Sequence, residues 1–283
     1  MSAWIHALAR RIVQSWPWNR GRWRIISLLS KVVLGSDESV APIGKIAFPF
    51  QSYQWNFYFG LFEVETKQLL NTLLRTGDVF VDIGANVGYF SAVAADAVGP
   101  SGRVISSEPE PVHFARLERL ANLNADYSII CHRQALSDCD GTAQFYVCEH
   151  PGWHSLMKDF PNAPIAQTID VVTTTLDQML NDYSLMCESS VRVVKIDVEG
   201  AELLVLSGAS QTLTMRCVDF YLVEISPTLG LEPLKRFFDE PGYMPFEWDA
   251  VRGKWIRARC LQSEERIENI LWARPGSHPA LIE

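Results

Sequence analysis

An acidic residue and two glycines occur within seven positions of the stretch VDIGANVGYFS, residues 81–91. Asp82 follows an apolar run, and Gly84 and Gly88 come just before a helical pattern that starts at about Tyr89. Glycines at such a turn allow positive φ angles and let the backbone approach a neighbouring group closely. Two explanations are open at this point, because a strand-to-helix turn often needs glycine for packing alone and because such a turn also suits a bound ligand.

A second carboxylate favours the ligand. Glu108 directly follows the next apolar strand, in VISSEPEP, 26 residues after Asp82. If the two strands are parallel neighbours, the Glu108 carboxylate lies beside the glycine turn and can accept hydrogen bonds from both hydroxyls of a ribose. The pattern is D-x-G-x-N-x-G and not the G-x-G-x-x-G of dinucleotide sites, and Asp82 would repel a pyrophosphate. These residues therefore indicate S-adenosylmethionine, which has an ammonium group, a sulfonium group and no phosphate, in preference to NAD.

A third set of polar residues lies in VVKIDVEGAE, residues 193–202. Asp197 is expected at the carboxyl end of a buried strand, where a carboxylate is costly unless it has a partner or a task. Methyl transfer to a hydroxyl needs a base for the acceptor's proton. Asp197 is the favoured candidate, with Glu199 and His154 as the others. Asp197 and Glu199 could instead hold a divalent cation, but two carboxylates without a matching histidine do not predict a metal site.

The elements that position these residues alternate between strand and helix from about residue 64. The pattern predicts helices at 64–74, 89–98, 112–124 and 201–206, and strands at 79–83, 104–107, 128–132, 191–197 and 220–225. Such alternation predicts an α/β fold with a mostly parallel sheet that is covered on both faces. Ligands of these sheets bind at the carboxyl ends of the strands, near a topological switch point. The segment 148–168 is irregular in pattern and indicates a loop that closes over the substrate.

Composition sets the limits of the fold. A chain of 283 residues with 48% hydrophobic residues can bury one substantial core. The net charge of −8 gives no general attraction to nucleic acid. Six cysteines without a C-x-x-C pair indicate reduced thiols in a cytoplasmic protein. The longest uncharged stretch, residues 46–62, has 17 residues and several polar ones, which is too short for a membrane-spanning helix.

The N-terminal segment differs from the rest in charge. Residues 1–31 contain six Arg or Lys, no Asp or Glu, and several tryptophans. This composition suits an amphipathic helix on an anionic membrane surface, which would be the inner face of the membrane for a cytoplasmic protein. A helix docked on the acidic main domain needs the same apolar stripe, so both interpretations are open. The predicted parts are the basic segment 1–31, a cap at 32–63 and the main domain at 64–283.

Residues 60–273 resemble the FkbM-type S-adenosylmethionine-dependent methyltransferases. The resemblance rests on VDIGANVGYF, ALSDCDG, WHSL, TTTLDQML, KIDVEGAE and YLVEISP, of which KIDVEGAE is the most distinctive. It implies a Rossmann-like class I methyltransferase fold with a seven-stranded sheet, and methyl transfer to a hydroxyl of a sugar, a glycan or a natural product. It also implies a cofactor site in which Asp82, Gly84, Asn86 and Gly88 line the methionine end, Glu108 the ribose, and Ser137 with Asp138 the adenine. The family pattern usually has serine at the position of His154, so the acceptor side is expected to differ.

Two other classes of function remain open from the sequence. An NAD-dependent or nucleotide-sugar oxidoreductase would share the fold and the ribose-binding acid, but it needs a catalytic pair such as Tyr-x-x-x-Lys, which does not occur in the chain. A non-catalytic, membrane-associated module could keep the fold with an inert site. Binding of S-adenosylhomocysteine or of NAD would distinguish the three classes.

Overall fold

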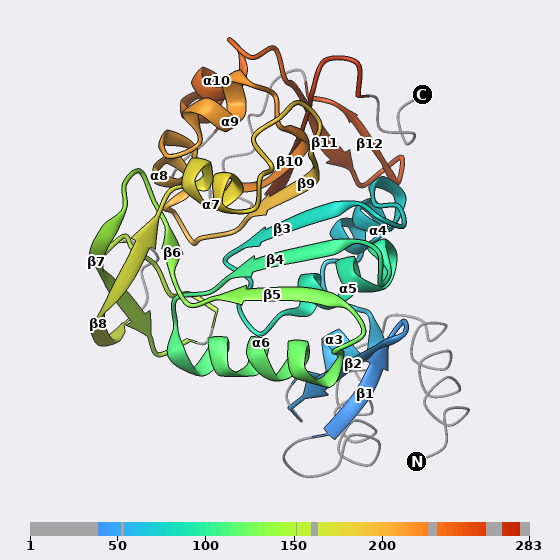
Figure 1. Ribbon diagram of the computed structural model, residues 1–283, viewed down its shortest axis with the longest axis vertical. Coiled ribbons are helices and arrows are strands. Elements are labelled where there is room, and N and C mark those ends of the chain that lie inside the picture. The colour runs from blue at the N-terminus through green and yellow to red at the C-terminus, as the bar shows by residue number, and fades with distance from the viewer. Residues whose placement is uncertain are drawn as a thin grey trace.

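The computed structural model describes residues 39–51, 54–150, 152–159, 164–225, 231–258 and 268–277 (Figure 1). The basic segment 1–31, with its predicted membrane contact, lies outside these residues, as does the first part of the predicted cap. Among the residues that are described, no helix is both long enough and apolar enough to cross a membrane.

A mixed sheet forms the centre of the molecule. In the described part of the chain it has eight strands, in the order β12-β11-β13-β10-β9-β3-β4-β5. Their bounds are β3 Val79–Ile83, β4 Arg103–Ser107, β5 Ser128–His132, β9 Val191–Ile196, β10 Val218–Ile225, β11 Met244–Asp249, β12 Lys254–Arg257 and β13 Glu268–Ala273. The five neighbouring strands β10, β9, β3, β4 and β5 run parallel, and β13 pairs with β10 in the antiparallel direction. The predicted mostly parallel sheet is confirmed, with β12 as one strand more than the resemblance implied.

Helices cover both faces of this sheet. One face carries α4 (Val64–Leu73), α5 (Tyr89–Val98) and α6 (Pro111–Leu123), and the other carries α7 (Leu176–Asp182), α8 (Glu202–Ser207), α9 (Ser210–Thr214) and α10 (Glu232–Phe238) (Figure 1). Successive residues of a strand point to opposite faces. Phe80 of β3 therefore packs with the first group, and Val81 packs with the second.

The chain order creates a switch point between β3 and β9. From β3 the chain proceeds outward through β4 to β5, and it later returns to place β9 on the other side of β3, followed by β10. The connections therefore leave β3 and β9 in opposite directions, which opens a crevice at their carboxyl ends.

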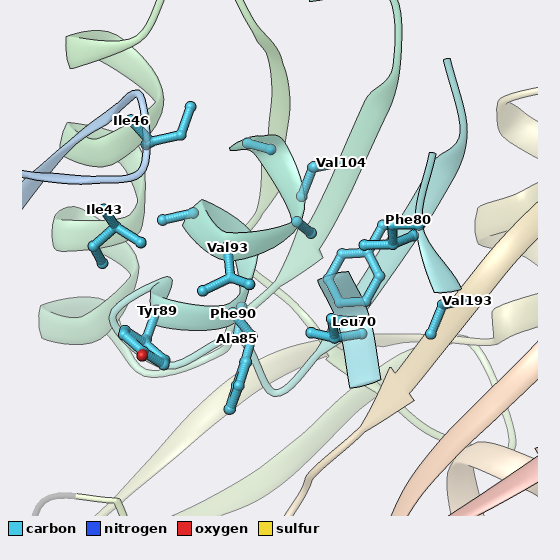
Figure 2. Close-up of a cluster of buried hydrophobic side chains, with 14 of the residues drawn as sticks. Ile43, Ile46, Leu70, Phe80, Ala85, Tyr89, Phe90, Val93, Val104 and Val193 are labelled. Atoms are coloured by element: carbon cyan, nitrogen blue, oxygen red, sulfur yellow. The ribbon is translucent and has the colours of Figure 1, made fainter. Parts of the chain in front are cut away.

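The aromatic stretch before the main domain joins the same core. It forms the hairpin β1 (Ser39–Ile43) and β2 (Ile46–Phe50) and the short helix α3 (Trp55–Phe59). Figure 2 shows Ile43 and Ile46 of the hairpin beside Tyr89 and Val93 of α5, in one cluster with side chains of the sheet. Most of its aromatic side chains are thus ordinary packing.

The sequence pattern predicts no strand between β5 and β9, but two long strands lie there. A three-stranded sheet contains β6 (Ala135–Leu136), β7 (Gly141–Cys148) and β8 (Ile165–Thr174). One face of β7 and β8 contributes to a small hydrophobic cluster that contains Ala135, Phe145 and Val171. Most other side chains of β8 are exposed. The sequence of a half-solvated hairpin contains few apolar residues, so its pattern resembles that of a loop.

Candidate active site

A cavity of about 620 Å³ lies at the carboxyl ends of the central strands. It is lined by all three residues predicted as catalytic, Asp197, Glu199 and His154. It is also lined by four of the residues predicted to bind the cofactor, Asp82, Gly84, Asn86 and Glu108. The fold therefore brings together residues that lie up to 117 positions apart in the sequence.

The glycine turn after β3 is shaped first by its protein neighbours. Gly84 has φ +80°, and a Cβ added there would lie 1.8 Å from the carbonyl oxygen of Asp197. Gly88 has φ +85°, and its Cβ would lie 2.7 Å from Leu120 of α6. Gly84 also lines the cavity, whereas Gly88 is not part of its lining. The close approach that these glycines permit is therefore an approach to the rest of the chain.

Asp82 offers an unsatisfied acceptor at this cavity. Its side chain is buried, and its Oδ2 accepts a hydrogen bond from the Ser91 hydroxyl at 2.6 Å. Its Oδ1 is buried without a hydrogen-bond partner among the described residues. Burial raises the pKa of Asp82, and the positive charge of Lys195 opposes this effect. A cationic group in the cavity would stabilise such a carboxylate.

Glu108 links the ends of neighbouring strands. Its carboxylate accepts the backbone N–H groups of Asn86 at 2.8 Å and of Glu110 at 2.9 Å. Burial raises the pKa of Glu108 to about 8, although these two hydrogen bonds favour the ionised form. Each carboxylate oxygen can accept a further hydrogen bond, so the predicted contact with a ribose remains possible.

A smaller apolar cavity of about 40 Å³ adjoins the first and shares Gly84 and Glu108 with it. Its walls include Leu136, Phe145, Leu156 and Val198. Ser137 and Asp138, predicted at the adenine, line neither cavity. The Ser137 hydroxyl donates to the Asp138 carboxylate at 3.1 Å, and the Ser137 carbonyl packs against Gly208. In this segment the cavity wall ends one residue before Ser137, at Leu136.

Asp197 forms an ion pair with a buried lysine. Lys195 is 1% exposed, and its Nζ donates to Asp197 Oδ2 at 2.5 Å. Lys195 also stands directly opposite Asp82 in the register of β9 and β3. Burial would raise the pKa of Asp197, but Lys195 and hydrogen bonds with Lys195 and Glu224 hold it below its usual value. An ionised carboxylate in this state is a weak base.

Glu199 and Glu224 complete a cluster with Asp197. One carboxylate oxygen from each of the three residues lies within 4.8 Å of the others. Burial, and then the charge of Asp197, raises the pKa of Glu199 to about 8. The same two causes raise the pKa of Glu224 far more, and Glu224 shares a hydrogen bond with Asp197. Glu224 therefore keeps its proton at neutral pH, whereas Glu199 titrates near neutrality, which suits a general base.

The sequence analysis did not assign a role to Glu224. The signal was present in YLVEISP, where the glutamate lies near the end of an apolar strand just as Asp197 does. The three carboxylates could hold a divalent cation, but the Lys195 ammonium already compensates the charge of Asp197.

His154 is held by a backbone contact. Its Nδ1 accepts the N–H of Cys148 at 3.0 Å, and its ring stacks on His113 with the ring centroids 5.0 Å apart. Burial lowers the pKa of His154. A neutral imidazole that accepts at Nδ1 carries its hydrogen on Nε2. This arrangement favours His154 as a hydrogen-bond donor rather than as a base.

Aromatic and polar side chains from the segment 148–168, which was expected to close over the substrate, and from the aromatic stretch form the outer wall. Trp153 lines the cavity and packs against the His150 ring, with the centroids 4.6 Å apart and the ring planes tilted by 33°. Phe57 and Phe62, from the aromatic stretch, also line the cavity, and both pack on Tyr89. A wall of rings with polar edges suits a ligand that has both apolar faces and hydroxyl groups.

Together, the doubly wound sheet, the strand-end acids and the cavity at the switch point define a Rossmann-like protein with the class I methyltransferase fold, as the sequence predicted. The model of the methyltransferase FkbM domain family matches residues 82–243, and the chain belongs to this family.

One relative is the hexuronic acid methyltransferase AglP of Haloferax volcanii, which is 27% identical over 173 residues. The match covers 60% of this chain and 64% of AglP, so the chain spans less than two thirds of the length of this relative.

Two solved structures show a more distant similarity. The methyltransferase FkbM from Methylobacillus flagellatus KT is 15% identical, with a TM-score of 0.44, over 95% of this chain and 59% of that chain. M. jannaschii TYW2 in complex with AdoMet is 12% identical, with a TM-score of 0.43, over 84% of this chain and 86% of that chain. Similarity at this level says nothing about the acceptor or the cofactor of this chain.

Proposed function

We propose that this protein is an S-adenosylmethionine-dependent O-methyltransferase that acts on a hydroxyl of a sugar, a glycan or a natural product. The observation that carries the proposal is the set of acidic side chains around the cavity. Six of them line it, from Glu63, Asp82, Glu108, Asp197, Glu199 and Glu224, and Lys195 is the one Lys or Arg among the described lining residues. Burial raises the pKa of most of these acids, so a cationic ligand would favour their ionised forms, whereas a pyrophosphate would meet Lys195 already paired with Asp197.

The residues present fit the cofactor that the family name implies. Asp82 has a buried oxygen without a partner for an ammonium group, and Glu108 has capacity to accept hydrogen bonds from a ribose. The apolar side chains beside Glu108, among them Leu136 and Phe145, offer a surface against which the adenine could pack. When bound, S-adenosylmethionine supplies an activated methyl group on a sulfonium.

In this proposal Glu199 accepts the proton of the acceptor hydroxyl. The acceptor oxygen would take the methyl group as the methyl–sulfur bond breaks and its electron pair stays on sulfur, and the hydroxyl proton would move to a Glu199 carboxylate oxygen. Glu224 keeps its own proton and shares it with Asp197, which Lys195 holds in the ionised form. His154 can donate from Nε2 to the acceptor and orient it. Asp197, which the sequence favoured as the base, contributes negative charge and fixes Lys195.

The acceptor class is supported by the wall of the cavity and by one relative. Trp153 offers a ring face, and the nearby histidines offer polar edges, which together suit a sugar ring. AglP is named as a hexuronic acid methyltransferase. We propose a sugar hydroxyl as the first acceptor to test.

Calorimetry and a transfer assay test the proposal together. The protein should bind S-adenosylhomocysteine and not NAD, and it should transfer labelled methyl groups to at least one member of a panel of neutral and acidic sugars. Glu199→Gln should keep S-adenosylhomocysteine affinity and lower turnover by roughly 10²–10⁴. Binding of NAD instead would indicate an oxidoreductase, and binding of neither ligand would indicate a non-catalytic module.

We also propose that residues 1–31 contact the cytoplasmic face of an anionic membrane. The support is their sequence, with six basic residues and no acidic ones. The full chain should sediment with anionic vesicles at low salt, and a chain without residues 1–31 should not. Equal behaviour of the two chains would contradict this contact.

A further inference from the structure

The turn that carries Glu199 has an unusual backbone. Glu199 has φ +53°, a conformation that is rare for residues other than glycine, asparagine and aspartate. Such a residue is strained by roughly 1–3 kcal/mol and persists only where the surrounding structure holds it. Two side chains supply that restraint, one from within the turn and one from outside it.

The inner restraint is Glu202. Its side chain is 2% exposed, and one of its carboxylate oxygens accepts the N–H of Gly200 at 3.0 Å. Glu202 stands in the first turn of α8, where a carboxylate interacts favourably with the helix dipole. The structure shows a buried carboxylate that closes the turn.

The outer restraint is Ser155, which is fully buried. Its hydroxyl donates to the Glu199 carbonyl oxygen at 2.7 Å and accepts the N–H of Met157 at 2.9 Å. Its own backbone exchanges two hydrogen bonds with Tyr146 of β7, at 2.8 and 3.1 Å. The position of Ser155 is therefore fixed by β7, and its hydroxyl has both of its bonding directions in use.

We infer that Ser155 is a positioning residue for the methyl transfer, because its hydroxyl holds the Glu199 backbone in the conformation that directs the Glu199 carboxylate into the cavity. The inference rests on the proposed role of Glu199 as the base. Trp153 and His154, which immediately precede Ser155, line the same cavity. The segment 153–155 thus contributes side chains to the wall proposed for the acceptor and also fixes the turn that carries Glu199.

Loss of the Ser155 hydroxyl has a defined consequence. The Glu199 carbonyl loses its donor, so the strained turn can relax and the carboxylate can move away from the acceptor. Cofactor contacts at Asp82 and Glu108 come from other strand ends and are not affected. Ser155→Ala should therefore lower kcat about tenfold, while the KM for the acceptor and the affinity for S-adenosylhomocysteine stay within about twofold, since small displacements of a catalytic group are costly.

A double-mutant cycle tests whether Ser155 acts through Glu199. Ser155→Ala should lower kcat about tenfold in the wild-type background and by less than about twofold in the Glu199→Gln background, because contacting residues are not additive. Equal factors in both backgrounds, or full activity of Ser155→Ala, would overturn the inference. Full activity of Glu199→Gln would instead show that the proposed base is wrong, and the inference would fall with it.

The pH profile adds a readout that a purely structural role would not change. In Ser155→Ala the acid limb of the kcat profile should move to lower pH, because a displaced Glu199 is less buried and less close to Asp197. An unshifted limb would contradict the inference. Ser190→Ala is the matched control, since the Ser190 hydroxyl also donates to a backbone carbonyl, that of Leu185, but Ser190 lies at the amino end of β9, away from the cavity at the carboxyl ends of the strands. If Ser155→Ala does not fold, Ser155→Cys keeps the size with a weaker donor and is subjected to the same cycle.

Discussion

Two strand-to-helix turns of this molecule stand side by side and are built differently. The glycine turn, residues 84–88, follows β3, and the acidic turn, residues 197–202, follows the adjacent strand β9. Each turn is closed by a buried glutamate that accepts backbone N–H groups, Glu108 in the first and Glu202 in the second. Glu108 lines the main cavity, whereas Glu202 is not part of its described lining.

The positive φ angles of the two turns show a second difference. In the glycine turn, the residues with positive φ are glycine or asparagine, and these residue types tolerate the left-handed region. The acidic turn has Gly200 and Glu199 at such angles, and glutamate does not tolerate this conformation well. The first turn is therefore relaxed and suits binding, whereas the second holds strain at the residue that we propose as the base.

The largest expected effect concerns the contact between the turns. Gly84→Ala would place a Cβ 1.8 Å from the Asp197 carbonyl oxygen. It should lower the free energy of unfolding by about 3–4 kcal/mol, through left-handed strain and overpacking together. Gly77→Ala is the control, because Gly77 also has positive φ but its Cβ would meet nothing closer than 3.9 Å. Chemical denaturation should show a loss of only about 1–2 kcal/mol for the control. Equal losses would mean that the two turns do not constrain each other.

The two closing glutamates should separate binding from turnover. Glu108→Gln should weaken S-adenosylhomocysteine binding by about 1–3 kcal/mol, because it replaces one acceptor oxygen in the cavity by an amide NH2 group, which only donates. Glu202→Gln should leave that affinity unchanged and reduce turnover, because it loosens the turn of Glu199. Calorimetry and initial rates measure both quantities. A loss of affinity in Glu202→Gln would remove the distinction between the turns.

The pH dependence of turnover should identify the base. Glu199 must lose its proton to act as a base, and burial with the Asp197 charge raises its pKa to about 8. The rate should therefore rise about tenfold per pH unit up to about pH 8 and then level off. If the rate instead levels off at a pH below the usual histidine pKa, the base is His154, because burial lowers the pKa of His154. A rate that is flat down to the acid range would point to Asp197, whose pKa lies below its usual value.

The smallest effect should be a gain. Glu199→Gly relieves the left-handed strain, which outweighs the added entropy of glycine in the unfolded chain, so the free energy of unfolding should rise by about 0.5–1 kcal/mol. Asn86→Gly, at φ +50° in the glycine turn, should change it by less, because asparagine already tolerates this conformation. Thermal or chemical unfolding of both variants measures the difference. Destabilisation by Glu199→Gly would show that the acidic turn is not strained.

Local patterns predicted much of the fold. The strand at Val79–Ile83 and the helix at Tyr89–Val98 have the predicted bounds, because an apolar run and a glycine turn mark both ends within the sequence. The hairpin of β7 and β8 could not be predicted in the same way, because it depends on pairing across an intervening segment and buries few apolar side chains. The strands β11 to β13 add antiparallel pairing at the edge of the sheet, and no local sequence pattern predicted this pairing.

The residues of the cavity that could be predicted from the sequence are those at the ends of apolar strands. Asp82, Glu108 and Asp197 were found because each ends an apolar strand, and the parallel sheet places such ends at one edge. The pairing of Lys195 with Asp197 and its position opposite Asp82 depend on the register of two strands far apart in the sequence. The shift of the proposed base from Asp197 to Glu199 follows from that pairing, which the sequence alone does not specify.

The contact between Gly84 and the Asp197 carbonyl also limits how this protein can change by recombination. The space that a side chain at residue 84 would need is occupied by the backbone of the acidic turn. A chimera that takes the glycine turn from one family member and the acidic turn from another must match the two surfaces at this point. We expect these turns to be exchanged between related chains only as a unit, whereas the outer wall around Trp153 can be replaced separately to alter the choice of acceptor.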